Sequence, residues 1–175
     1  MKILDLFIRS PEKTAAHRLY EQIVLHARSP GFYLKLGVPD TVDGRFDMIV
    51  LHTFLVLHRL KSDPQQTAKL SQRLFDLLFA DMDQNLREMG VGDLSVGKKI
   101  KKMTAAFQGR LVAYEKALES KSELKQALDR NLYRHQETND EHLDFMADYV
   151  LRQAKALSRQ TTAALMHGHV EFATQ

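Results

Sequence analysis

The segment between Arg45 and Ser62 constrains the fold of this chain more than any other, because its residues are apolar around most of a helix. A stripe at helical spacing is formed by Phe46, Ile49, Val50, Phe54, Leu57 and Leu60, and is widened by Met48, Leu51, Leu55 and Val56. A helix that is apolar nearly all round is buried on most sides. The sequence therefore predicts a central helix over residues 45–62 that other helices surround.

The remainder of the chain is also typical of helices. Only eight glycines and four prolines interrupt the 175 residues, and β-branched residues nowhere alternate over a strand-length stretch. A chain of this length with 44% hydrophobic residues can bury one ordinary core. We expect an all-α fold: a single-domain helical bundle of about six to seven helices over residues 1–175, with a frayed tail after Leu165.

Local signals predict where several helices begin and end. Ser10 followed by Pro11 is a good start, and Asp63-Pro64 ends the central helix and begins the next one. Gly90 is a plausible helix-ending glycine, and Ser122 and Asp140 are expected to cap two later helices. A further helix is marked by Val96 to Leu118, and Gly109 within it predicts a close approach of a neighbouring helix.

Composition excludes several kinds of protein. The absence of cysteine excludes disulfides, thiol catalysis, cysteine-ligated zinc and covalently attached haem. A net charge of +3 is small for a dedicated DNA-binding protein, so we expect no DNA partner. No stretch reaches the ~18 apolar residues of a membrane-spanning helix. The start of the chain, MKILDLFIRSPEK, resembles neither a signal peptide nor a transit peptide. These features predict a cytoplasmic protein, with peripheral contact at the inner membrane as the alternative.

Motifs for chemistry are also missing. The sequence has no phosphate-binding glycine loop, no nucleophile elbow and no Glu-x-x-His pair. Asp81-x-Asp83 resembles part of a calcium loop, but it lies in a predicted helix and lacks the remaining EF-hand spacing. Most of the eight histidines are expected at the surface or the edge of the core. We therefore expect no catalytic residue, no metal and no cofactor, and a protein that is not an enzyme.

The first candidate binding segment is the loop before the central helix, with Asp40, Asp43, Arg45 and Asp47. Two interpretations are open. In one, Asp43 caps the helix, Asp47 supports its first turn and Arg45 pairs with a neighbouring carboxylate. In the other, the loop binds a partner.

The second candidate segment is the turn between two predicted helices. Four lysines lie in the first two turns of the second helix, where the helix dipole disfavours cations. They are Lys98, Lys99, Lys101 and Lys102, and the preceding acids are Asp81, Asp83, Glu88 and Asp93, with Arg87 among them. Either these acids neutralise the lysines across the turn, or the lysines form a basic patch for RNA phosphate, lipid headgroups or an acidic protein.

Three long runs resemble a known family. They are GVPDTVDGRFD (residues 37–47), LHTFLVLHRL (51–60) and LFDLLFADMDQNLREMGVGDLSVGKKIKKM (74–103). They resemble the ubiquinol–cytochrome c chaperone family, whose members assist assembly of respiratory complex III, and the resemblance is strongest over residues 19–118. Because the chain starts without a targeting presequence, it resembles a bacterial member.

The resemblance implies a non-enzymatic assembly chaperone whose client is apocytochrome b or another hydrophobic membrane protein. Mitochondrial relatives act with a small helical partner near the ribosomal tunnel exit, so a ribosome contact is a further expectation. The expected partner-binding residues are Asp40, Asp43, Arg45, Asp47, Asp81, Asp83, Lys98, Lys99 and Lys102.

Met82, Met89 and Met103 suit an irregular apolar client, or they fill the core. Two other functions stay open. One is a ribosome- or RNA-binding module, which would bind with a steep salt dependence. The other is a helical lipid- or quinone-binding protein, which would contain an enclosed apolar pocket.

Overall fold

The computed structural model describes residues 10–135 and 138–174, and over these residues the chain is helical with no strand. The helices are α1 (Pro11–Ala27), α2 (Pro30–Leu34), α3 (Val42–Leu60), α4 (Pro64–Glu88), α5 (Asp93–Ala117), α6 (Lys121–Leu128), α7 (Asp140–Ser158) and α8 (Thr162–Met166), and a π-helical turn η2 (Asp129–Tyr133) continues α6. Six of them have at least eight residues, so the all-α prediction is confirmed. The predictions for the start of the chain concern residues 1–9, outside those described.

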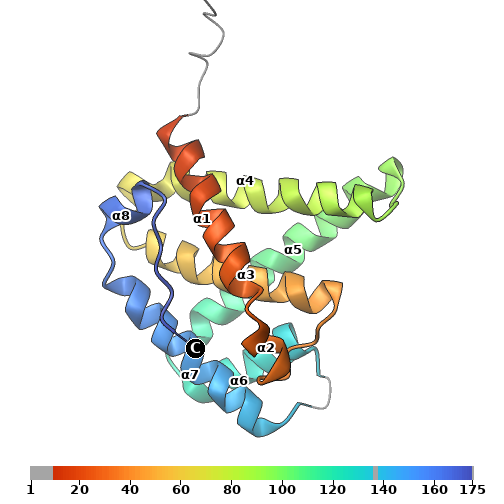
Figure 1. Ribbon diagram of the computed structural model, residues 1–175, viewed down its shortest axis with the longest axis vertical. Coiled ribbons are helices and arrows are strands. Elements are labelled where there is room, and N and C mark those ends of the chain that lie inside the picture. Colours follow the sequence, from red (N-terminus) through yellow and green to blue (C-terminus); the bar gives the residue numbers. More distant parts are fainter. Residues whose placement is uncertain (1–9, 136–137, 175) are drawn as a thin grey trace, which may run out of the picture.

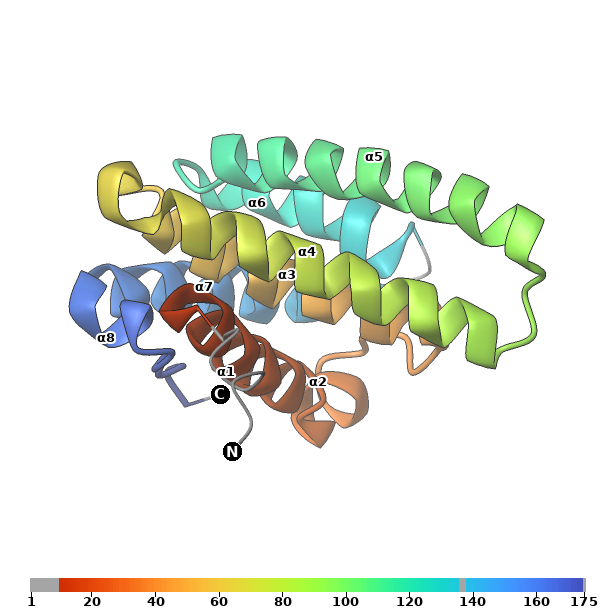
Figure 2. The ribbon, with the colours of Figure 1, turned by 90° about the horizontal axis from the view of Figure 1, so that it is seen from above.

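Helix α3 occupies the centre, as its sequence predicted. Thirteen of its 19 residues are buried, and α1, α4, α5, α7 and η2 all pack against it. Figures 1 and 2 show α1 crossing one side of α3, α4 and α5 running along another, and α7 closing the bundle below. The helix begins at Val42, three residues before the predicted start, because Thr41 and not Asp43 accepts the capping hydrogen bond.

The local end signals predict most helix boundaries to within two residues. Ser10 accepts from the Lys13 amide, and Gly90 has the positive φ (82°) of a helix-ending glycine. Two predicted caps were wrong by one or two positions. Ser120 and Asn139 are the N-caps of α6 and α7, because their side chains accept hydrogen bonds from the first-turn amides.

The predicted close approach at Gly109 is wrong, because a Cβ there would meet nothing within 4 Å. The close approach lies at Gly44, where a Cβ would stand 2.0 Å from the carbonyl oxygen of Pro39. The loop that leads into α3 therefore folds tightly back on the first turn of that helix.

The tail after Leu165 is packed and not frayed, contrary to the sequence prediction. The Phe172 ring stacks on His26 with centroids 4.5 Å apart. The Gln153 side chain donates to the Ala173 carbonyl (2.7 Å) and accepts from the Ala173 amide (2.8 Å). The C-terminal segment thus covers the α1–α7 side of the core.

Beneath this tail lies a buried histidine, an exception to the prediction that most histidines lie at the surface or the core edge. His52 is fully buried, with Nδ1 2.8 Å from the Met48 carbonyl and Nε2 2.7 Å from the Tyr149 hydroxyl. A carbonyl only accepts, so Nδ1 carries the proton and Nε2 accepts from Tyr149. Burial lowers the pKa of His52 to about 3.

Candidate functional site

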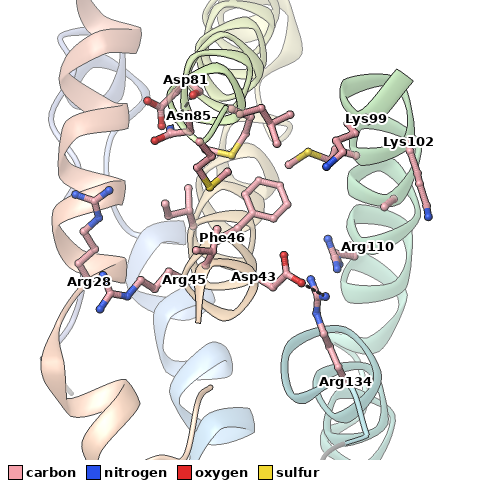
Figure 3. Close-up of a pocket in the computed structure, with 17 residues that line it drawn as sticks. Arg28, Asp43, Arg45, Phe46, Asp81, Asn85, Lys99, Lys102, Arg110 and Arg134 are labelled. Carbon is pink, nitrogen blue, oxygen red and sulfur yellow. Dashed lines mark hydrogen bonds and ion pairs between the residues drawn. The ribbon is translucent and has the colours of Figure 1, made fainter. Parts of the chain in front are cut away.

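A groove of about 590 Å³ opens to solvent between the start of α3, the end of α4 and the first half of α5. Its apolar lining consists of Val42, Phe46, Ile49, Met82, Leu86, Met89, Met103 and Ala106. Figure 3 shows the Phe46 ring at the middle of the groove, with sulfur-bearing side chains around it. We call this hollow the α3–α5 groove.

One apolar face of α4 extends from the core into the groove. Near the middle of the helix, Phe79 is only 8% exposed and packs against Phe107 of α5 with ring centroids 5.6 Å apart. At the end of the helix, Met89 on the same stripe is 55% exposed. The helix dimensions account for this, since α4 and α5 have 25 residues each and α3 has 19. This face of α4 therefore begins in the core and ends in the groove.

The rim of the groove is strongly basic. Its six cationic side chains face two carboxylates, a formal excess of four positive charges; they are Arg28, Arg45, Lys99, Lys102, Arg110 and Arg134, with Asp43 and Asp81. Within the described residues, Arg28, Lys99 and Lys102 form no ion pair, whereas the other three cations do. The rim can therefore attract an electron-rich group with three unpaired cations.

The loop before α3 contains the predicted Arg45 pair. Arg45 Nε donates to Asp40 Oδ1 at 2.6 Å, and both side chains are more than half exposed. The hydrogen bond from Arg45 lowers the pKa of the Asp40 carboxyl. Asp43 does not cap α3; it accepts from Arg134 at 2.8 Å on the rim.

Asp47 was predicted to support the first turn of α3, but it is a buried tie between distant segments. It is 1% exposed, its Oδ2 accepts from Arg134 Nε at 2.7 Å, and its Oδ1 lies 3.0 Å from Arg110 Nη2. The Oδ1 contact is an ion pair without hydrogen-bond geometry. Burial raises the pKa of Asp47 and the two arginines oppose this shift. Asp47 therefore positions two rim arginines and does not line the groove.

Of the two interpretations of the α4–α5 turn, the structure contradicts the one in which the acids pair with the lysines. Each acid has a partner other than a lysine: Asp81 accepts from the Tyr20 hydroxyl at 2.7 Å, Asp83 and Asp93 share Arg87, and Glu88 accepts from Gln84. All four lysines are exposed. In the part of the chain that the structure describes, none of them forms an ion pair. The basic patch is therefore free.

The structure brings together five of the nine predicted site residues. Asp43, Arg45, Asp81, Lys99 and Lys102 line the α3–α5 groove, from segments that lie far apart in the sequence. Asp47 lies beneath them, and Asp40, Asp83 and Lys98 lie outside the lining.

Sequence reasoning missed Arg28, Arg110 and Arg134 as rim residues. Arg134 has a left-handed backbone (φ 55°), and its Nε and Nη1 bond Asp47 and Asp43. No spacing rule in the sequence links position 134 to position 47.

Residues 10–135 and 138–174 contain neither a candidate metal site nor a candidate membrane span. No group of three or more potential metal-ligating side chains comes together, and no helix combines the length and the apolar character needed to cross a bilayer.

The fold and the sequence together define the class of protein. The model of the family described as "Ubiquinol-cytochrome C chaperone" matches residues 34–172. The chain belongs to this family, which is one of assembly chaperones and not of enzymes.

Individual relatives agree with the assignment. The crystal structure of the Cbp3 homolog from Brucella abortus is 37% identical, with a TM-score of 0.85 over 99% of this chain and 97% of that one. Human ubiquinol-cytochrome c reductase complex assembly factor 1 is 27% identical over 91% of this chain and 54% of that protein. Mitochondrial protein CBP3 of Saccharomyces cerevisiae is 27% identical over 87% and 47%. The chain thus spans about half the length of these two curated relatives.

Proposed function

We propose that this protein is a non-enzymatic assembly chaperone for respiratory complex III that holds newly made cytochrome b, or a similar hydrophobic membrane protein, in the α3–α5 groove. The names of its relatives support the assembly role. The observation that carries the proposal is the groove itself, an open apolar floor beneath a rim with unpaired cations.

The floor suits one apolar face of a client helix. Amphipathic or apolar helices bind other proteins by laying such a face into a hydrophobic groove. Met82, Met89 and Met103 line the floor, and methionine side chains adapt to irregular surfaces because they are unbranched and polarizable. A client segment would be shielded from water there, with no bond made or broken.

The rim determines which end of the client is held. Arg28, Lys99 and Lys102 lack ion-pair partners among the described residues. They would bind an acidic or carbonyl-rich segment that flanks the apolar helix of the client. Release then requires only that the client find a better-buried site in the growing complex.

Crosslinking in respiring cells tests this role. A photoreactive residue at Met89, which lines the groove, should capture cytochrome b, and the same residue at Leu34, which is 82% exposed outside the groove, should not. Equal capture at both positions, or normal complex III in a deletion strain, would refute the proposal.

A charge reversal tests the rim. Lys99→Glu with Lys102→Glu should reduce complex III, whereas Lys35→Glu with Lys155→Glu, also exposed lysines without ion pairs in the described structure, should leave it near normal. If both double variants behave alike, the rim has no specific role.

The alternatives make different predictions. A ribosome contact near the tunnel exit predicts salt-sensitive co-sedimentation with ribosomes. A lipid or quinone carrier predicts stoichiometric binding of an isolated small apolar molecule. The groove volume falls in the range of ligand pockets, so a quinone-binding titration is the direct test of that function.

A further inference from the structure

The α4–α5 connection forms one extreme end of the molecule, where the two longest helices meet beyond the rest of the bundle (Figures 1 and 2). Two large apolar side chains are exposed there: Met89 by 55% and Leu94 by 93%. Leu94 is the most exposed large hydrophobic residue of the described chain. We call residues 89–102 the hairpin tip.

A separate face of α5 extends from Leu94. Lys98 and Lys101 follow it at i+4 and i+7, and residues at this spacing share one side of a helix. Lys99 and Lys102 belong to the neighbouring side, which lines the α3–α5 groove, whereas Leu94, Lys98 and Lys101 do not line it. The hairpin tip thus has an apolar end and a lysine face that the groove leaves unused.

The positive charge of this face is uncompensated. The nearby acids are already held by Tyr20, Arg87 and Gln84. Residues 87–102 carry five cations and two carboxylates. A long lysine side chain can keep its ammonium at the polar surface while a neighbouring apolar residue lies deeper. By the rise of a helix, Lys101 stands about 10 Å along the axis from Leu94.

These features favour a lipid bilayer over RNA. An RNA surface offers phosphates but no apolar phase for Leu94. Recognition of unpaired bases uses aromatic rings or arginine planes, and residues 89–102 contain neither. An anionic bilayer supplies both an apolar phase and negative headgroups. The apolar end of the hairpin tip can meet the first, and the lysines further along α5 can meet the second.

We propose that the hairpin tip docks on an anionic lipid bilayer, with Leu94 entering the headgroup–acyl boundary and Lys98 and Lys101 contacting the headgroups. The contact gives a specific surface to the peripheral inner-membrane contact that the sequence left open as an alternative. It does not depend on what the α3–α5 groove binds. A chaperone held this way would present its groove beside the surface from which a membrane-protein client emerges.

Vesicle flotation tests the docking. The full chain should float with vesicles of phosphatidylcholine and phosphatidylglycerol and not with phosphatidylcholine alone, and rising salt should weaken the binding. Lys98→Gln with Lys101→Gln should weaken it about 25-fold, since one lysine near an anionic surface contributes roughly a factor of five. The matched control is Lys35→Gln with Lys155→Gln, which should bind as the unchanged chain does.

A fluorescent residue tests insertion. The chain contains no tryptophan, so Leu94→Trp supplies a single reporter. Its emission should shift to the blue with anionic vesicles, and lipids brominated near the headgroup should quench it. A tryptophan at Leu34, which is 82% exposed, should show neither effect.

Three results would overturn the proposal: no flotation with anionic vesicles, equal flotation of the tip and control variants, or an unshifted Leu94→Trp emission in bound protein. Tight, salt-sensitive binding to ribosomal RNA in place of vesicles would assign the lysines to RNA instead. Crosslinking of cytochrome b in the groove is measured separately, so failure of the docking leaves that result intact.

Discussion

The substitution Asp47→Asn tests the central claim about how the groove is built. Asn has nearly the shape of Asp but no charge, so it removes the ion pairs with Arg110 and Arg134 and leaves the packing in place. If Asp47 only supported the first turn of α3, the loss would be a few tenths of a kcal/mol. If it is a buried tie, the loss is much larger.

The structure sets the magnitude. Removing one partner of a fully buried ion pair costs about 3–5 kcal/mol. Here Asp47 is 1% exposed, but Arg110 and Arg134 are 14% and 38% exposed, and Arg134 keeps its bond to Asp43. Water can partly solvate both arginines. The neutral Asn side chain also avoids the cost of burying a charged carboxylate, which offsets part of the loss. We therefore expect a loss of about 2 kcal/mol, less than the fully buried case.

Urea denaturation followed by far-ultraviolet circular dichroism measures this loss. For a chain of this size it corresponds to a fall in Tm of roughly 4–8 °C. The matched control is Asp43→Asn. The Asp43 carboxylate pairs with the same Arg134, but its side chain is 69% exposed. That variant should lose no more than about 0.5 kcal/mol. Equal losses from the two variants would refute the assignment of Asp47 as the buried tie.

Three further predictions concern other parts of the fold. Burial lowers the pKa of His52 from its ordinary 6.5 to about 3. As the pH falls, His52 is therefore protonated in the unfolded chain before it is protonated in the folded chain. As pH falls from about 6 to 4, His52 should therefore reduce the free energy of unfolding by about 1.4 kcal/mol per pH unit, and His52→Gln should remove that slope in urea titrations. Gly44→Ala should destabilise by about 2 kcal/mol or more through the Pro39 carbonyl, whereas Gly109→Ala should stabilise by about 0.5–1 kcal/mol in thermal melts. Phe172→Ala should cost about 1–2 kcal/mol and speed amide exchange in the tail.

Each of these has a contradicting result. An unchanged pH slope in His52→Gln would mean that another group takes up the proton. Equal effects of alanine at Gly44 and Gly109 would mean that the Pro39 loop moves aside without cost. Unchanged exchange at residues 170–174 in Phe172→Ala would mean that the tail is held by its hydrogen bonds to Gln22, Gln153 and Gln160 and not by the Phe172 ring.

The sequence was most informative where the determining interactions are local. The apolar stripe of the central helix, the Ser10-Pro11 start and the Gly90 end were all predicted, since periodicity and capping depend on residues a few positions apart. The same locality explains the errors at Ser122 and Asp140. Several polar residues in a row can each cap a helix, and only the backbone course selects one.

Pairing between distant charges could not be predicted. Cationic residues that could pair with the Asp47 carboxylate occur throughout the chain, and a pair that forms joins residues 87 positions apart. The lysines show the same limit: the sequence left open whether the acids of the turn neutralise them, and in the structure Arg87 and Tyr20 hold three of those acids. Charge counts along a sequence do not show which groups meet.

The sequence by itself therefore determined that this chain forms helices around one apolar helix, and its long runs indicated its family. The tertiary structure decided that the loop before α3 and the α4–α5 turn border one groove, that Asp47 lies beneath that groove, and that Lys98 and Lys101 face away from it. The reason is physical. Helix formation depends on neighbours within one or two turns, whereas a groove and its rim depend on where long helices cross.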